Sequence, residues 1–165
     1  MRWNELESEP CPVARAVSVI GDRWTVLVLR ESFKGATRFE EFCAGLGAPR
    51  ATVASRLAGL VEAGVLLRRP YADHPPRSDY LLTDRGRALQ PVIMTLAHWS
   101  ETWLAHPTAQ AFDRRHTICG HRFKPVVSCS KCGEEIQPGE VEYGTRQKTA
   151  KTASLMPGSP DGDHP

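Results

Sequence analysis

Hydrophobic residues recur at three- and four-residue steps in several segments of the first hundred residues, a spacing typical of amphipathic helices. In the first segment, Val13, Val17 and Ile20 follow this spacing, and Pro12 suits a first helical turn. The next apolar segment, residues 24–33, has the length of a short buried helix. Its valines leave a strand as the alternative.

Two short helices are predicted next, separated by a tight turn. The first spans residues 38–47, turns Phe39, Phe42, Cys43 and Leu46 inward, and ends at Gly47. The second spans residues 48–64 and ends at Gly64. Its predicted buried stripe consists of Val53, Leu57, Leu60 and Val61. This spacing is typical of a helix-turn-helix.

Two strands and a long helix complete the first hundred residues. The strand candidates are Val65–Arg69 and Ser78–Leu82, joined by a polar connection. A helix is then predicted over residues 83–104, with Thr83 as its N-cap. Pro91 either kinks this helix or marks its true start. The order of elements predicts a winged helix-turn-helix, a mainly α fold with a small β-hairpin wing.

The solvent face of the second short helix suits a DNA major groove. Its outward side chains are small, which allows close approach to base edges, and Arg50 lies near its start. The whole chain carries only +2, but residues 42–77 hold five arginines and two acids, a local charge of +3 (5 minus 2). The candidate DNA-binding residues are Arg50, Thr52, Ser55, Arg56, Arg68, Arg69 and Arg77. The alternative is a helical domain with ordinary surface arginines.

Several motifs occur together over Cys11 to Leu104: CPVARAVSVIGDRWTVLVLRE, TRFEEF, VASRLAGLVEAGVLLRRPY and PPRSDYLLTDRGRALQPVI. Jointly they resemble the HxlR-type family of bacterial winged-helix transcription regulators. The resemblance implies a homodimer that binds double-stranded DNA at an inverted-repeat operator, and we expect a repressor. It also implies that the first and last helices of this region form the dimer interface. The interface candidates are Val13, Val17, Leu96, Trp99 and Trp103. Burial in the core of one chain is the alternative for Trp99 and Trp103.

Cys11 stands just before the first helix, and in several similar family members a cysteine at this place senses oxidants or electrophiles. A helix N-terminus favours the thiolate, the reactive form of cysteine. The hypothesis is that modification of Cys11 changes the dimer geometry and so the DNA affinity. The alternative is a small side chain packed beneath the dimer. A small-molecule effector is a further possibility that the sequence leaves open.

The late cysteines predict a metal site rather than disulfides. Three of the five cysteines crowd into residues 119–132. Cys129 and Cys132 have the two-residue spacing of a zinc knuckle, and His116 and Cys119 repeat it. Three thiolates with one imidazole would satisfy a closed, structural zinc site, in which His121 competes with His116 for the fourth position. The segment 116–143 is therefore predicted as a small zinc-ribbon-like β unit. A metal-free extension is the alternative.

The predicted domains are a flexible N-terminus (1–10), the winged-helix DNA-binding and dimerisation domain (11–104), a linker (105–115), the zinc-ribbon-like segment (116–143) and a disordered tail (144–165). We expect a cytoplasmic protein, because no apolar run could cross a membrane and no secretory signal is present. No catalytic constellation is found, so we expect no enzyme. The rival functions are a protein-interaction adaptor and a dithiol redox protein using Cys129 and Cys132, although the latter lacks a βαβ context.

Overall fold

The computed structural model describes residues 3–74, 76–104, 107 and 113–144. The chain divides into two compact units, Met1–Val126 and Val127–Pro165, and each is described by itself. The segment 116–143, predicted as one unit, is therefore divided between both. Most of the predicted linker and nearly all of the predicted tail lie outside the described residues. No helix in the described part of the chain is long and apolar enough to span a membrane.

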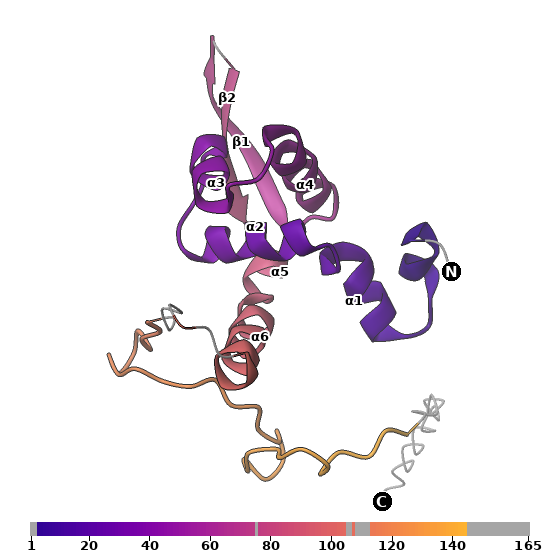
Figure 1. The fold of residues 1–165 in the computed structure, drawn as a ribbon. Helices are drawn as coiled ribbons and strands as arrows, with labels where there is room; N and C mark the ends of the chain where they lie inside the picture. The colour runs from indigo at the N-terminus through magenta and orange to yellow at the C-terminus, as the bar shows by residue number, and fades with distance from the viewer. Residues whose placement is uncertain (1–2, 75, 105–106, 108–112, 145–165) are drawn as a thin grey trace, which may run out of the picture. The chain divides into compact units, whose positions relative to one another are not determined.

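Four α-helices and one 3₁₀-helix build the first half of unit 1 (Figure 1). They are η1 (Trp3–Ser8), α1 (Pro12–Ile20), α2 (Arg23–Phe33), α3 (Phe39–Leu46) and α4 (Arg50–Glu62). The predicted helices are confirmed, and the apolar segment after Asp22 is a helix rather than a strand. The N-terminal ten residues, predicted as flexible, contain η1.

Local capping explains where these helices begin and end. The Asp22 carboxylate accepts the N–H groups of Trp24 and Thr25 at 2.9 and 3.2 Å, so it caps α2. Helix α3 ends at Gly47, whose φ of 60° is left-handed, as the sequence predicts. The second helix of the pair begins three residues later, at Arg50.

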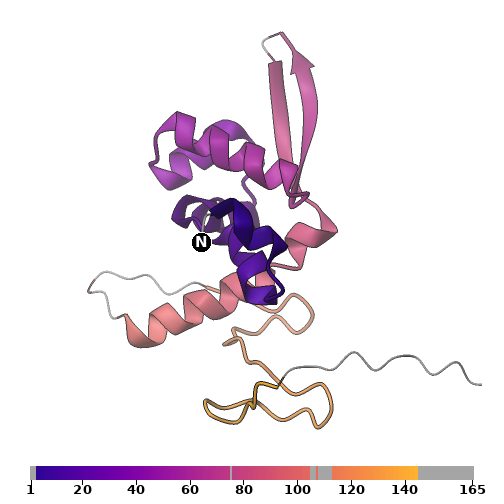
Figure 2. The ribbon, with the colours of Figure 1, turned by 90° about the vertical axis from the view of Figure 1, so that its right-hand side faces the viewer.

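The hairpin is longer than predicted. Strand β1 (Leu66–Asp73) pairs antiparallel with β2 (Pro76–Leu82), and the register shifts between Pro70 and Ala72. Proline has no N–H to give to the ladder, so an irregularity at this place is expected. The N–H of Tyr80 donates to the carbonyl of Thr37 at 2.7 Å, which ties the base of the hairpin to the start of α3. The hairpin projects beyond the helices as a wing (Figure 2).

The single long helix predicted over residues 83–104 is in fact two helices, α5 (Asp84–Arg87) and α6 (Gln90–Trp103). Thr83 is the N-cap of α5, as predicted, because its hydroxyl accepts the N–H of Gly86 at 3.1 Å. Pro91 stands in the first turn of α6, so it marks a start and not a kink.

One hydrophobic core ties the helix-turn-helix to the base of the wing. The buried apolar side chains are Val28, Leu29, Phe42, Val53, Leu57, Leu60, Val65 and Leu66. Val61 and Cys43, predicted to face inward, are only half-buried against it. The Phe42 ring meets the Tyr80 ring edge to face, with centroids 6.4 Å apart. Because α4 packs on this core, its opposite face is fixed toward solvent.

Candidate nucleic-acid interface

Arg50 stands in the first turn of α4 and is exposed, so its side chain is accessible to DNA. Two of its guanidinium nitrogens each donate to an oxygen of Glu40, on α3, at 2.6 Å. The guanidinium also lies 4.8 Å from the centre of the Phe39 ring. Arg50 is therefore held in a defined orientation, and the hydrogen bond from Arg50 lowers the pKa of the Glu40 carboxyl.

A groove of about 680 Å³ runs between the start of α3, the start of α4 and the wing. Three predicted DNA-binding residues line it, namely Arg50, Arg68 and Arg77. Arg38 also lines it, with its guanidinium 5.5 Å from the centre of the Tyr71 ring. Sequence reasoning missed both residues, since Arg38 was only the first residue of a predicted helix and Tyr71 lay beyond the end of a predicted strand.

The remaining DNA-binding candidates have different surroundings. Ser55 is exposed and Thr52 is half-buried. Arg69, on β1, pairs with Asp79 on β2 at 3.5 Å. The Arg56 guanidinium donates to both oxygens of Asp22, at 2.8 and 3.3 Å, so its side chain links α4 to the start of α2. The structure thus separates Arg56 from the arginines of the wing groove.

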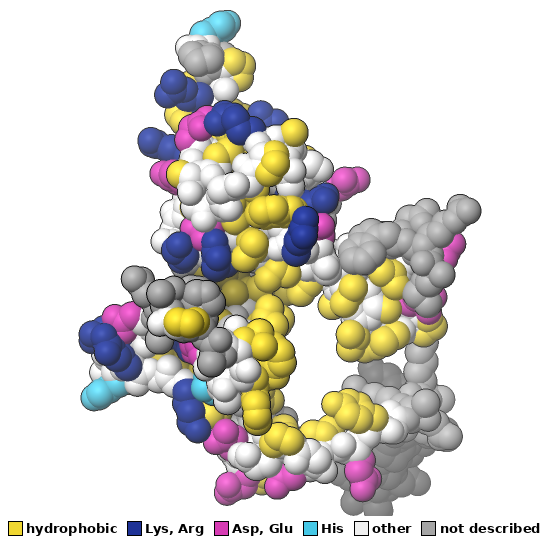
Figure 3. Space-filling view, in the orientation of Figure 1, with side chains coloured by type: hydrophobic (Ala, Val, Ile, Leu, Met, Phe, Trp, Pro, Cys, Tyr) yellow, Lys and Arg dark blue, Asp and Glu magenta, His cyan; other side chains and the backbone are white. Residues whose placement is uncertain are grey.

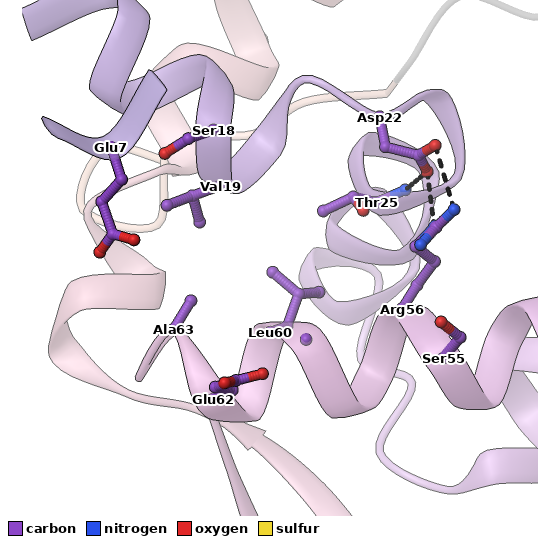
Figure 4. A pocket seen from close by; sticks show the side chains of 11 residues that line it. Glu7, Ser18, Val19, Asp22, Thr25, Ser55, Arg56, Leu60, Glu62 and Ala63 are labelled. Atoms are coloured by element: carbon purple, nitrogen blue, oxygen red, sulfur yellow. Dashed lines mark hydrogen bonds and ion pairs between the residues drawn. The ribbon is translucent and has the colours of Figure 1, made fainter. Parts of the chain in front are cut away.

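A second cleft, of about 460 Å³, lies between η1, α1 and the other end of α4 (Figure 4). Its walls include Glu7 and Ser18 on one side and Glu62 and Ala63 on the other. The Asp22–Arg56 ion pair lies at its edge. Burial opposes ionisation of Asp22, but the N–H of Thr25 and the Arg56 guanidinium outweigh it and lower the pKa of this carboxyl.

The five dimer candidates are all exposed in the single chain. Val13 on α1 is 68% exposed, and Trp99 and Trp103 on α6 are 53% and 71% exposed. The two tryptophan rings are therefore not part of the core of one chain, which was the alternative. Figure 3 shows hydrophobic side chains gathered over both α1 and α6. Cys11 is the N-cap residue of α1 and is also exposed.

The predicted metal ligands are brought together in pairs. In unit 1, the His116 Nδ1 atom lies 3.4 Å from the Cys119 sulfur. In unit 2, the backbone N–H groups of Cys132 and Lys131 point at the Cys129 sulfur and lower the pKa of that thiol. Within the described residues, no group of three or more metal-binding side chains is assembled.

Comparison with known proteins bears on the winged-helix region. Residues 19–108 match the HxlR-like helix-turn-helix family. The chain belongs to this family. An uncharacterized HTH-type transcriptional regulator of Mycobacterium tuberculosis is 44% identical over 129 residues, which cover 78% of this chain and 82% of that protein. An uncharacterized HTH-type regulator of Synechocystis is 36% identical over 61% of this chain and 75% of its own length.

Solved structures agree with the family assignment. The crystal structure of PA1607, described as a candidate transcription factor, has a TM-score of 0.74 and 33% identity, covering 85% of this chain and 98% of that one. The redox regulator HypR in its reduced form has a TM-score of 0.53 and 29% identity, covering 56% of this chain and 92% of that one. As an HxlR-like protein, the chain is a DNA-binding transcription regulator with a winged helix-turn-helix fold.

Proposed function

We propose that this HxlR-like regulator acts as a homodimeric repressor that reads an inverted-repeat operator with helix α4 and the wing. The observation that supports this most directly is the groove in which Arg50, Arg68 and Arg77 face the same space beside α4. Arginine forks suit both phosphates and guanine edges, and the N-terminal residues of a recognition helix make the base contacts.

In this proposal α4 enters the major groove and the wing follows the neighbouring phosphates. The exposed side chains of Ala51 and Ser55 on α4 are small, so they do not hold the helix away from the bases. Arg68 and Arg77 bind phosphates and contribute the salt-dependent part of the affinity. Arg56 has a different role: it keeps α4 attached to Asp22, at the junction between α1 and α2.

The proposed dimer buries the apolar face formed by α1 and α6. Exposed tryptophans on one helix are costly in water and are typical of surfaces that bind a partner. A second copy is the proposed occupant, because a two-fold dimer presents two α4 helices to two half-sites of an inverted repeat. The face consists of Val13, Val17, Val92, Leu96, Trp99 and Trp103.

We also propose that Cys11 is the redox-sensing residue. It is exposed at the first turn of α1, a helix of the proposed dimer face. Helix α1 leads directly to Asp22, and Asp22 holds Arg56 on α4. A shift of α1 on modification of Cys11 is therefore transmitted to α4, the reading helix, through the Asp22–Arg56 ion pair. The relative HypR is named a redox regulator.

The test is fluorescence anisotropy of the purified chain against DNA tiles from around its own gene, over a salt series. One tile bound far more tightly than the others is the expected result, and Arg50→Ala weakens that binding by about 30-fold, the loss of one good bidentate contact. Glu40→Gln is the matched variant. It frees Arg50 without removing it, so affinity for all tiles rises.

Two results would overturn the proposal. Absence of binding at any salt concentration, with the fold intact, would favour the protein-interaction adaptor. Unchanged operator affinity in Arg50→Ala would mean that α4 is not the reading helix.

For the redox role, oxidant treatment should release the operator from the wild type and not from Cys11→Ser. A Cys11→Ser protein that still loses DNA on oxidation would exclude Cys11 as the sensor.

A further inference from the structure

A third cavity, the α1–α5 cavity, has a volume of about 250 Å³ and lies between α1, α5 and the start of α6. Its apolar walls are Ala16, Val19 and Ile20 from α1, Val65 just before β1, and Leu89 between α5 and α6. Val65 is part of the buried core, and Val19, Ile20 and Leu89 pack against that core. The α1–α5 cavity is therefore a hollow over the hydrophobic core of unit 1.

The charged residues that line the α1–α5 cavity are all positive. Among the described residues they are Arg15 on α1 and Arg85 on α5, and no acidic residue lines it. The neighbouring cleft of about 460 Å³ has the opposite character, because Glu7, Asp22 and Glu62 line it. The field of a cleft follows the charges on its walls, so the α1–α5 cavity favours an anion and the larger cleft does not.

Neither of the two arginines is neutralised by a carboxylate within the part of the chain that the structure describes. The Nη1 atom of Arg15 donates to the carbonyl oxygens of Glu9 and Pro10, both at 2.8 Å, and these acceptors are uncharged. On α5, Arg87 pairs with Asp84 at 2.6 Å, whereas Arg85 has no such ion pair. Both guanidinium charges are therefore available to an anionic ligand.

The backbone that carries Arg85 is held firmly in place. The hydroxyl of Thr83 donates to the carbonyl of Gly64 at 2.8 Å, and the N–H of Thr83 donates to the carbonyl of Val65 at 3.1 Å. These bonds fix the start of α5 beside the wall that Val65 forms. A ligand therefore meets a preformed wall, which lowers the entropic cost of binding.

The size and the lining of the cavity select a class of ligand. A closed apolar cavity of about 150 Å³ holds benzene, so about 250 Å³ has room for such a ring and a carboxylate group. Guanidinium groups bind carboxylates through charge-assisted hydrogen bonds. An inorganic anion, in contrast, leaves the apolar walls unfilled.

We propose that the α1–α5 cavity binds a compact organic monocarboxylate. The apolar body of the ligand packs against Val19, Ile20 and Leu89, and its carboxylate binds the guanidinium groups of Arg15 and Arg85. The ligand thereby connects α1, a helix of the proposed dimer face, to the residue that precedes the wing. We expect it to change operator affinity. This effector role rests on the proposed function, whereas ligand binding itself does not.

The experiment is a ¹H–¹⁵N NMR titration of the full-length chain with benzoate at constant ionic strength. Benzoate should shift the amide signals of Ala16, Val65 and Leu89, with a dissociation constant on the order of 1 mM or lower, the range of so small a ligand. Benzamide and benzylammonium offer the same ring without a carboxylate. Both should bind at least about 10-fold more weakly, because the charge-assisted hydrogen bonds are lost.

Variants separate the charges from the apolar space. Arg15→Gln and Arg85→Gln should each weaken benzoate binding about 10-fold. Arg87→Gln is the matched control, since it removes the same charge from α5 at a position that does not line the cavity, and it should bind like the wild type. Ala16→Leu keeps both charges but fills the apolar space, so it should also weaken binding. Far-ultraviolet circular dichroism checks that each variant is folded.

Three results would overturn the proposed site. One is the absence of saturable shifts with benzoate. The second is shifts confined to the wing groove, which would mean that benzoate binds only the DNA-binding arginines. The third is equal affinity for benzoate and benzylammonium, or for wild type and Arg85→Gln.

Operator binding with and without benzoate tests the effector role separately. Benzoate should change the operator affinity of the wild type by about 5-fold, a usual size for coupling between two sites, and that of Arg85→Gln much less. Bound benzoate with unchanged operator affinity would overturn the effector role. Bound benzoate in a chain that binds no DNA tile would count against the proposed function and not against the site.

Discussion

The winged-helix body, residues 12–103, and two short turns, residues 115–122 and 128–135, are held by different physical means. The body buries eight apolar side chains completely, drawn from α2, α3, α4, β1 and the residue before β1. The two turns bury none, and each is closed by short backbone hydrogen bonds and a left-handed glycine, Gly120 in the first and Gly133 in the second. The chain therefore combines a region held by burial with turns held by backbone hydrogen bonds and backbone conformation.

Glycine shows the same difference at the level of single residues. In the body, Gly86 is required for space, since a Cβ added there would lie 2.2 Å from the carbonyl oxygen of Val65. In the turn 128–135, Gly133 meets no such obstacle, and nothing lies within 4 Å of a Cβ built on it. Its requirement is the left-handed φ. Packing selects the first glycine, and backbone conformation selects the second.

The strongest way to sharpen this comparison is to remove one large side chain from each region. Phe42→Ala should lower the free energy of unfolding of the body by about 4 kcal/mol, because a fully buried ring is replaced by a cavity. Ile118→Ala, in the turn 115–122 and at a position 87% exposed, should change it by less than about 0.5 kcal/mol. Urea unfolding followed by circular dichroism measures both. Equal effects would show that the two regions share one core.

The next largest effect should come from the glycines of the body. Gly86→Ala forces the start of α5 away from Val65 and should destabilise the body by about 2 kcal/mol, as overpacking does. Gly59→Ala is the matched control on α4, where nothing lies within 4 Å of the added Cβ. It should stabilise the body by about 0.5 kcal/mol through reduced chain entropy. If Gly59→Ala also lowers the melting temperature, the lack of room for a Cβ at Gly86 does not explain the destabilisation by Gly86→Ala.

The smallest effect concerns the ion pair between Asp22 and Arg56. The folded pKa of Asp22 is lowered, so its contribution to stability is complete above the unfolded value, near 3.8, and is lost as the pH falls through the folded value. Asp22→Asn keeps the cap on α2 but removes the charge. The difference in unfolding free energy between wild type and variant should be about 0.5 kcal/mol at pH 7, the size typical of a partly exposed pair.

A pH series of unfolding curves from pH 7 to pH 3 checks this expectation. The difference should shrink only below about pH 4, where the Asp22 carboxylate of the unfolded chain begins to take up a proton. A difference near zero at every pH would show that Asp22 stabilises the body as a cap alone, because the asparagine keeps that cap.

Sequence reasoning succeeded where one local signal decides the structure. The helical spacing of Val53, Leu57 and Leu60 predicted the buried face of α4, and Gly47 predicted the end of α3. It failed where tertiary contacts decide. Nothing local showed that Arg56 would pair with Asp22, 34 residues away. The break between α5 and α6 was only half visible, since Pro91 fits both a kink and a start.

The candidate DNA-binding site shows the same difference between local signals and tertiary contacts. The arginines near α4 were found because charge clusters are visible in the sequence, but their grouping depends on the wing. Arg50, Arg68 and Arg77 face one groove, and Arg69 pairs with Asp79 instead. The sequence left His116 and His121 as alternatives, because both lie close to Cys119. The fold places the His116 Nδ1 atom 3.4 Å from the Cys119 sulfur, a proximity that spacing alone did not reveal.

The pairing of Arg50 with Glu40 also makes DNA binding an ion exchange. In the free protein the guanidinium already has an anionic partner, so a base edge that binds Arg50 must displace the Glu40 carboxylate, which then attracts a cation from solution. In the proposed complex, the cation taken up at Glu40 partly offsets the cations that DNA releases where Arg68 and Arg77 bind phosphates. Salt dependence will therefore undercount the phosphates that this protein contacts, and its affinity will tolerate changes in ionic strength better than its arginines suggest.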